Sequence, residues 1–183
     1  MNKLLIPALL AALIVGCSST PLPDETSGAP VESRSGSTTN TNVAPVVAGG
    51  VDANGLPREL TDPKSTLAKR SIYFDLDKYE VKDEYKDLVA AHAKYLVAHR
   101  DFKVLLQGNT DERGSREYNL SLGQKRSDAV KRSLTLLGAR EEQIESVSLG
   151  EEKPKNAGHD ESAWSENRRA DILYKAADGR GEF

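Results

Sequence analysis

The pattern of hydrophobic and polar residues predicts four strands between residues 71 and 175. In SIYFDLD, residues 71–77, Ile72, Phe74 and Leu76 alternate with polar or tyrosine neighbours, which is the two-residue period of a half-buried strand. Short apolar or alternating runs predict three more strands, in FKVLLQG (102–108), IESVSLG (144–150) and RRADILYK (168–175).

Two segments between these strands have the period of an amphipathic helix instead. One follows the first strand and carries an apolar stripe of Val81, Tyr85, Leu88, His92, Tyr95 or Leu96, and His99. The other spans residues 115–138, with a stripe of Leu122, Ala129, Val130, Leu134 and Leu137. Ser115 suits the N-cap of this second helix and Gly138 suits its C-terminal end. The order β-α-β-α-β-β predicts an α+β domain, with two helices packed on a mixed four-stranded sheet.

The chain before this domain has a different composition. Residues 18–64 are rich in Ser, Thr, Pro, Gly and Asn and contain no aromatic residue. Such a segment buries too little apolar surface to offset the entropy of ordering it. We therefore expect a disordered linker over 17–64, a folded domain over 65–175, and a loose tail over 176–183. A plain spacer without its own partner is the simpler interpretation of the linker.

The first residues are typical of a secretory signal. Lys3 precedes an apolar run from Leu4 to Val15, which ends at Gly16 and Cys17. The run is short for a bilayer span, and the order of charge, apolar run and small residue predicts a secretory signal. Its ending, Ile14 to Cys17, resembles a bacterial lipobox, which implies a lipoprotein signal peptide over 1–16 and a lipid on Cys17. A buried cysteine in an N-terminal helix is the alternative. The residue after Cys17 is Ser18 and not an Asp, which would resemble an inner-membrane retention signal, so we expect sorting to the outer membrane.

Composition and spacing argue against several other functions. The formal net charge of -3 disfavours a nucleic-acid binder. A single cysteine precludes an internal disulfide. His92 and His99 lie about 10 Å apart along a helix, which is too far for one metal ion. No motif indicates a cofactor or a catalytic serine, so we expect neither a metal, a cofactor nor catalysis.

Arg126 and Asp111 are the charged residues that the pattern leaves unexplained. Arg126 lies on the apolar face of the second helix, so its guanidinium needs a carboxylate or a ring of carbonyls. Asp111 lies in a turn just after the second strand, where α/β folds often build pockets. Held slightly apart, the two charges would fit a zwitterion that bears both a carboxylate and an ammonium. An internal Asp111–Arg126 ion pair is the alternative, and it is left open by the spacing.

Four motifs, in order, resemble the OmpA-like peptidoglycan-binding domain and within it the peptidoglycan-associated lipoproteins: FDLDKYEV, GNTDERGSREYNLSLGQKR, GEEKP and NRRADILY. The resemblance implies noncovalent binding of meso-diaminopimelate, whose free end is such a zwitterion. It implies that the ligand-binding residues are Asp111, Arg126, Phe74, Asp75, Thr110, Asn119 and Leu122. It further implies support of the site by the turn glycines Gly108 and Gly114 and by Asn167, Arg168 and Arg169.

The resemblance also implies partners and a location. These are peptidoglycan, the outer membrane at its periplasmic face, and TolB and TolA of the Tol–Pal system, with roles in envelope integrity and cell division. An OmpA-like lipoprotein with other partners is the nearest alternative. A peptidoglycan hydrolase is an alternative from another class of protein.

Overall fold

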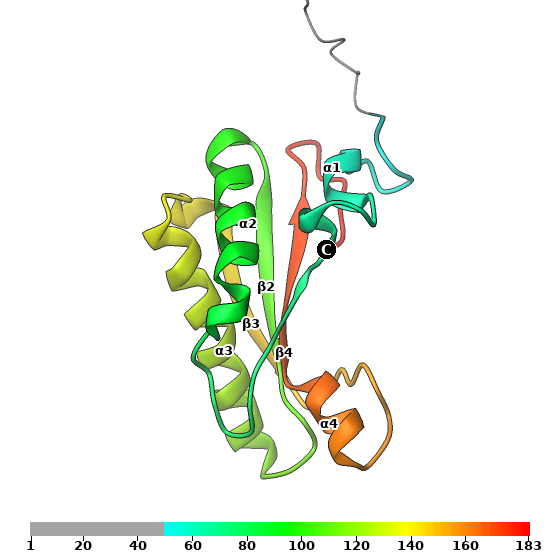
Figure 1. The fold of residues 1–183 in the computed structure, drawn as a ribbon, viewed down its shortest axis with the longest axis vertical. Coiled ribbons are helices and arrows are strands. Elements are labelled where there is room, and N and C mark those ends of the chain that lie inside the picture. Colours follow the sequence, from blue (N-terminus) through cyan, green and yellow to red (C-terminus); the bar gives the residue numbers. More distant parts are fainter. Residues whose placement is uncertain (1–49) are drawn as a thin grey trace, which may run out of the picture. The chain divides into compact units, whose positions relative to one another are not determined.

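The computed structural model describes residues 50–183 of the chain (Figure 1). The predicted signal peptide, Cys17 and linker residues 18–49 lie outside the described residues. Within residues 50–183, no helix has both the length and the apolar character that a membrane span requires.

A mixed four-stranded sheet forms the centre of the domain. Its strands are β1 (Ser71–Tyr73), β2 (Lys103–Asn109), β3 (Ile144–Gly150) and β4 (Arg169–Lys175), in the spatial order β1-β4-β2-β3. β4 runs antiparallel to both β1 and β2, whereas β2 and β3 are parallel. The predicted α+β class and mixed sheet are therefore confirmed, although β1 stops at Tyr73, earlier than the alternation indicated.

Two long helices, α2 (Lys86–Ala98) and α3 (Arg116–Leu136), lie on the same face of the sheet (Figure 1). Ser115 caps α3 as predicted, since its side chain accepts a hydrogen bond from the backbone N–H of Tyr118 at 3.2 Å. The predicted stripe of α3 is buried at Leu122, Val130 and Leu134, but Leu137 is exposed because it lies past the last turn.

Gly108 has a different role from the turn glycine that the resemblance implied. It lies inside β2, where a Cβ atom would stand 1.8 Å from the carbonyl oxygen of Gly123 on α3. Only a residue without a side chain allows this close approach of strand and helix. The contact places the end of β2 directly against the first turns of α3.

The folded domain begins earlier than the composition predicted. A short helix, α1 (Arg58–Thr61), and a 3₁₀ turn (Thr66–Ala68) precede β1. Leu56 and Leu60, which we had assigned to the linker, are fully buried in the core. Two apolar side chains at helical spacing gave too weak a signal among polar neighbours.

The predicted loose tail also differs from the structure. Residue Lys175 forms an isolated bridge with Gly181, which folds the tail back on β4. The Glu182 carboxylate accepts hydrogen bonds from Arg70 Nη1 at 2.8 Å and from the backbone N–H of Tyr174 at 2.7 Å. The tail thus packs against the end of the sheet near α1.

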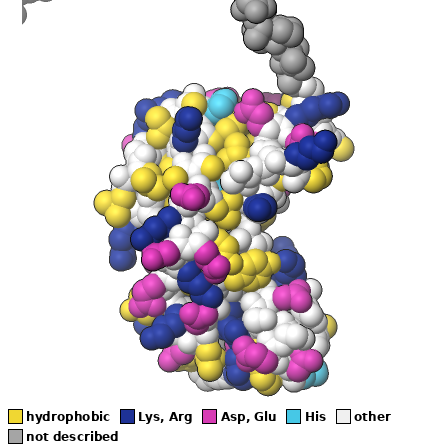
Figure 2. All heavy atoms as spheres, viewed as in Figure 1, with side chains coloured by type: hydrophobic (Ala, Val, Ile, Leu, Met, Phe, Trp, Pro, Cys, Tyr) yellow, Lys and Arg dark blue, Asp and Glu magenta, His cyan; other side chains and the backbone are white. Residues whose placement is uncertain are grey.

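One further helix was not predicted. It is α4 (Glu161–Asn167), which lies between β3 and β4 and carries Trp164. Two more 3₁₀ turns, Asp83–Tyr85 and Glu141–Gln143, precede α2 and β3. On the face shown in Figure 2, Lys and Arg side chains lie among Asp and Glu side chains rather than in one basic patch.

Candidate functional site

Five of the seven predicted ligand-binding residues line one small cavity, which we call the closed cavity. It lies where β2 ends and α3 begins, and its volume is about 30 Å³. Its lining residues are Leu76, Asp77, Thr110, Asp111, Arg113, Tyr118, Asn119, Leu122 and Arg126. Phe74 and Asp75, the other two predicted residues, do not line it.

Arg126 binds a ring of backbone carbonyls, one of the two arrangements that its position allowed. Its side chain is fully buried. Nε donates to the carbonyl of Lys78 at 2.9 Å, Nη1 to that of Asn109 at 2.8 Å, and Nη2 to that of Asp75 at 3.2 Å. Among the described residues Arg126 forms no ion pair, so the alternative of an internal Asp111–Arg126 bridge is wrong.

The guanidinium of Arg126 retains unused donors. It carries five N–H groups, and three of them are used by the carbonyls of described residues. One N–H on each Nη nitrogen is therefore left, which is the number that a bidentate carboxylate contact requires. Burial lowers the pKa of Arg126 to about 10, so the group is still charged at neutral pH.

Asp111 is buried beside the same cavity but pairs with other arginines. One carboxylate oxygen accepts from the backbone N–H of Arg113 at 3.1 Å. The other accepts from Arg113 Nη2 at 2.8 Å and from Arg168 Nη1 at 3.3 Å. Burial opposes ionisation of the Asp111 carboxyl, but these hydrogen bonds outweigh it and lower the pKa below its usual value. The cavity thus holds an ionised carboxylate and a guanidinium that do not neutralise each other directly.

The two arginines on Asp111 are fixed by α4. Arg168 donates to Glu161 at 2.6 Å and to the carbonyl of Phe74 at 3.1 Å, which fits the supporting role that the resemblance implied. The Arg113 guanidinium lies over the ring of Trp164, 4.1 Å from its centroid. The Asx turn that joins Arg113 to Asp111 is a local feature that the sequence encodes, whereas the contact of Arg113 with Trp164 is not local.

Residues 75–80, which follow Phe74 and which we call the lid, are all exposed, and two of them, Leu76 and Asp77, line the closed cavity. The Asp75 side chain points to Lys82, 2.7 Å away, while its carbonyl accepts from Arg126. Phe74 is buried before the lid, with its ring 5.3 Å from the Arg126 guanidinium. The Tyr118 hydroxyl of α3 donates to the Asp77 carboxylate, which joins the lid to the helix.

The remaining predicted residues support the loops around the cavity. Gly114 has a φ of 108°, a left-handed conformation that suits glycine in a turn. The Asn167 amide binds the backbone of Lys155 and Asn156 at 2.7–2.9 Å. Arg169 donates to Asp171 at 2.9 Å and to the carbonyl of Lys153 at 3.3 Å. Asn167 and Arg169 thus fix the segment that leads from β3 to α4.

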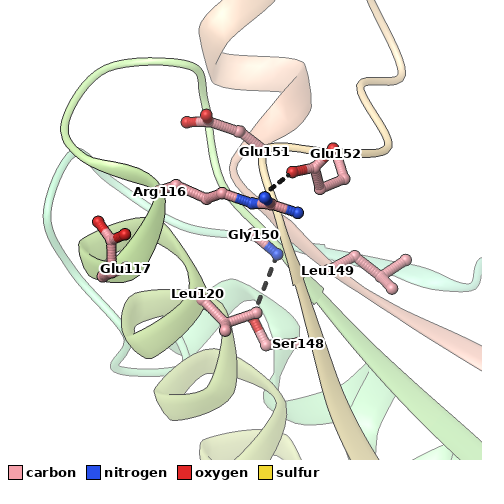
Figure 3. A pocket seen from close by; sticks show the side chains of 8 residues that line it. All are labelled: Arg116, Glu117, Leu120, Ser148, Leu149, Gly150, Glu151 and Glu152. Carbon is pink, nitrogen blue, oxygen red and sulfur yellow. Dashed lines mark hydrogen bonds and ion pairs between the residues drawn. The ribbon is translucent and has the colours of Figure 1, made fainter.

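A larger hollow, the outer groove, lies between the start of α3 and the end of β3 (Figure 3). Its volume is about 390 Å³, and it is lined by Arg116, Glu117, Leu120, Ser148, Leu149, Gly150, Glu151 and Glu152. Arg116 and Glu152 form an ion pair of 2.9 Å across it, and both side chains are more than half exposed. No residue predicted for the ligand lines this groove.

Metal binding has no support in the part of the chain that the structure describes, where no group of three His, Cys, Asp or Glu side chains could hold an ion. Cys17 is outside this part.

The family model of the OmpA family matches residues 73–168, which include the lid, the closed cavity and α4. This chain belongs to the OmpA family. It is 40% identical over 165 residues to the peptidoglycan-associated lipoprotein of Pseudomonas putida, covering 90% of this chain and 92% of that protein. The protein of the same name from Pasteurella multocida is 51% identical over 104 residues, covering 57% of this chain and 69% of the relative. The resemblance seen in the sequence is thus confirmed.

Solved structures agree with this assignment. The crystal structure of the peptidoglycan-associated lipoprotein from Burkholderia pseudomallei is 58% identical, has a TM-score of 0.63, and covers 64% of this chain and 99% of that one. The C-terminal domain of Helicobacter pylori MotB has a TM-score of 0.54 at 17% identity, covering 58% of this chain and 84% of that one. At this identity the MotB likeness concerns the fold alone.

Proposed function

We propose that this OmpA-family chain is an outer-membrane lipoprotein that binds the diaminopimelate of peptidoglycan stem peptides noncovalently and without catalysis. Relatives that carry the name peptidoglycan-associated lipoprotein over nearly the whole chain support the class of protein. The observation that supports this ligand is the buried Arg126, two of whose N–H donors are not used by residues 50–183, beside the ionised Asp111.

The proposed contacts follow from the charges of the ligand. The free end of diaminopimelate bears a carboxylate and an ammonium on one carbon. Arg126 receives the carboxylate in a bidentate contact, since its planar fork matches carboxylate geometry. Asp111 receives the ammonium, and Leu122 contacts the aliphatic stem. Thr110 and Asn119 supply polar contacts on the same wall.

The closed cavity must widen before this ligand binds. Its volume of about 30 Å³ leaves room for a few water molecules at most, which is too little for the end group of an amino acid. The lid is held in two ways: Arg126 binds the carbonyls of Asp75 and Lys78, whereas the tip at Asp77 is joined to α3 by the Tyr118–Asp77 hydrogen bond. Ligand binding would therefore open the Tyr118–Asp77 bond and displace Leu76 and Asp77, which line the cavity, while Arg126 stays bound to the two carbonyls.

Co-sedimentation with purified sacculi tests the site. We expect Asp111→Ala and Arg126→Ala each to abolish pelleting, while Arg116→Ala, in the outer groove, pellets like the unmodified protein. Circular dichroism checks that each variant is folded. If folded variants of Asp111 and Arg126 both pellet normally, the site assignment is wrong. Release of muropeptides that depends on a named side chain would instead indicate a hydrolase.

A lipid on Cys17 would hold the outer membrane while the domain holds the wall. One charge-assisted contact contributes about 1.5–3 kcal/mol, so each domain binds the wall weakly. Attachment then depends on many copies that bind at the same time. Membership of the Tol–Pal system, with TolB and TolA as partners and a role in cell division, follows from the family resemblance. A pull-down tests it: reproducible absence of TolB favours an OmpA-like lipoprotein with other partners.

A further inference from the structure

A second cavity adjoins the closed cavity on the other side of Thr110. Its volume is about 330 Å³, at the lower end of the range for ligand pockets. Its lining combines the turn after β2 with the segment that joins β3 to α4: Thr110, Glu112, Glu151, Pro154, Asn156, Ala157, Gly158, His159 and Asn167. None of the residues proposed to hold the charges of the ligand lines it.

The wall between the two cavities is thin. Thr110 lines both of them. Asn119, which lines the closed cavity, donates a hydrogen bond to the Glu151 carboxylate, which lines the second cavity. The two cavities are therefore separated only by Thr110 and by the Asn119–Glu151 hydrogen bond.

Thr110 carries an unused hydrogen-bonding group at this junction. Its side chain is 3% exposed, and its Oγ1 atom has no hydrogen-bond partner among residues 50–183. Buried hydroxyls nearly always have a partner, because leaving one unpaired costs free energy. The unpaired hydroxyl indicates a place where an outside group completes the site.

The chemistry of the second cavity restricts what it accepts. Glu112 and Glu151 give it two carboxylates, and no Lys or Arg is among its described lining residues. Glu112 is occupied by His159 and Trp164, whereas one oxygen of Glu151 makes no described hydrogen bond. Pro154 and Ala157 add apolar surface. This cavity favours N–H or O–H donors together with small apolar groups, and its carboxylates repel a ligand carboxylate.

We propose that the second cavity binds the neutral peptide segment attached to the diaminopimelate, which makes it a second subsite for the stem peptide. The inference rests on the proposed function. An amide N–H of the stem donates to Glu151, a stem carbonyl accepts from the Thr110 hydroxyl, and an alanine methyl packs on Pro154 and Ala157. The subsite discriminates against a free carboxylate on the residue that follows diaminopimelate. It therefore favours stems in which the carboxyl group of that residue is an amide or is linked to a further residue.

Calorimetry with two probes tests the subsite separately from the first site. The probes are free meso-diaminopimelate and the carboxamide of L-Ala-γ-D-Glu-meso-diaminopimelate-D-Ala. Ala157→Leu fills the second cavity at an exposed position, and Ala90→Leu, exposed on α2, is the matched control. We expect Ala157→Leu to weaken the tetrapeptide carboxamide about tenfold and free diaminopimelate less than about twofold, through loss of one or two hydrogen bonds. Ala90→Leu changes neither.

Equal weakening of both probes, or of neither, overturns the subsite. If the unmodified protein binds neither probe, the proposed function itself has failed, which is a different result. A third probe, the same tetrapeptide with a free terminal carboxylate, measures the charge preference. We expect it to bind about threefold more weakly than the carboxamide at low salt, from repulsion by Glu151. Glu151→Gln removes that difference, and a difference that persists in this variant contradicts the role of Glu151.

Discussion

The closed cavity and the outer groove lie on opposite sides of the first turns of α3, and they treat charge differently. The outer groove has more than ten times the volume, and its arginine, Arg116, pairs with Glu152 in solvent. The closed cavity holds a fully buried arginine, Arg126, that binds carbonyls and makes no ion pair with a described residue. On the proposed function, burial of a charge whose donors the described residues leave unused, rather than the size of a hollow, marks the binding site of a charged ligand.

The contrast between the two hollows is tested most strongly by a substitution at Arg126 that keeps the positive charge but removes the planar guanidinium. Arg126→Lys retains a cation but has only three N–H donors, which cannot serve three carbonyls and a ligand carboxylate together. We expect calorimetry to show about 100-fold weaker binding of meso-diaminopimelate. Arg116→Lys, the matched change in the outer groove, is expected to bind like the unmodified protein. Equal affinities for the two variants would remove the distinction between the sites.

A second contrast concerns two glycines, Gly108 at the contact of β2 with α3 and Gly150 in the lining of the outer groove. In Gly108→Ala the new Cβ would meet the Gly123 carbonyl at 1.8 Å, so β2 and α3 must separate. We expect a loss of about 3 kcal/mol in the free energy of unfolding, as in overpacked cores. Urea denaturation measures it.

The matched control is Gly150→Ala, which lines the outer groove. Gly150 has a φ of 53° and a nearest approach of 3.2 Å to Leu120 N. An alanine there costs about 1 kcal/mol for the left-handed backbone. A smaller loss for Gly108→Ala than for Gly150→Ala would show that the strand–helix approach is not what restrains this end of the domain.

The sequence predicted the parts of this site that depend on local pattern. Arg126 was identified because helical period placed a charge on an apolar face, and the period remains valid in the structure. Its actual partners, the carbonyls of Asp75, Lys78 and Asn109, come from two segments far away in the chain. Their convergence depends on how the lid folds over α3, which no local spacing encodes.

Two other features were hidden from the sequence for the same reason. Asp111 and Arg126 were predicted to lie slightly apart around a ligand, and both line one cavity. What the sequence did not indicate is that Arg113 and Arg168, the latter 57 residues later, hold the Asp111 carboxylate. Leu56 and Leu60 were assigned to the linker because their neighbours are polar, yet both are buried in the core. Composition averages over a segment, whereas burial depends on the tertiary position of individual side chains.

A smaller effect is expected at the lid. Tyr118→Phe removes the hydrogen bond to Asp77 that closes the cavity while leaving the ring in place. If the closed lid competes with the ligand, its loss raises the population that can bind, and the affinity for meso-diaminopimelate rises about threefold. Stopped-flow measurement should place most of this gain in the association rate. Weaker binding in Tyr118→Phe would mean that the hydroxyl contacts the ligand rather than holding the lid.

The smallest effect is expected in the outer groove. Arg116 and Glu152 are 76% and 57% exposed in their side chains, so their ion pair is screened by water and salt. Arg116→Gln should change the free energy of unfolding by less than about 0.5 kcal/mol in urea denaturation. Because this ion pair contributes so little, Arg116→Gln should also bind sacculi like the unmodified protein, at low salt and at high salt. Loss of sacculus binding in Arg116→Gln would show that an exposed, paired charge takes part in binding. The distinction between the closed cavity and the outer groove would then be wrong.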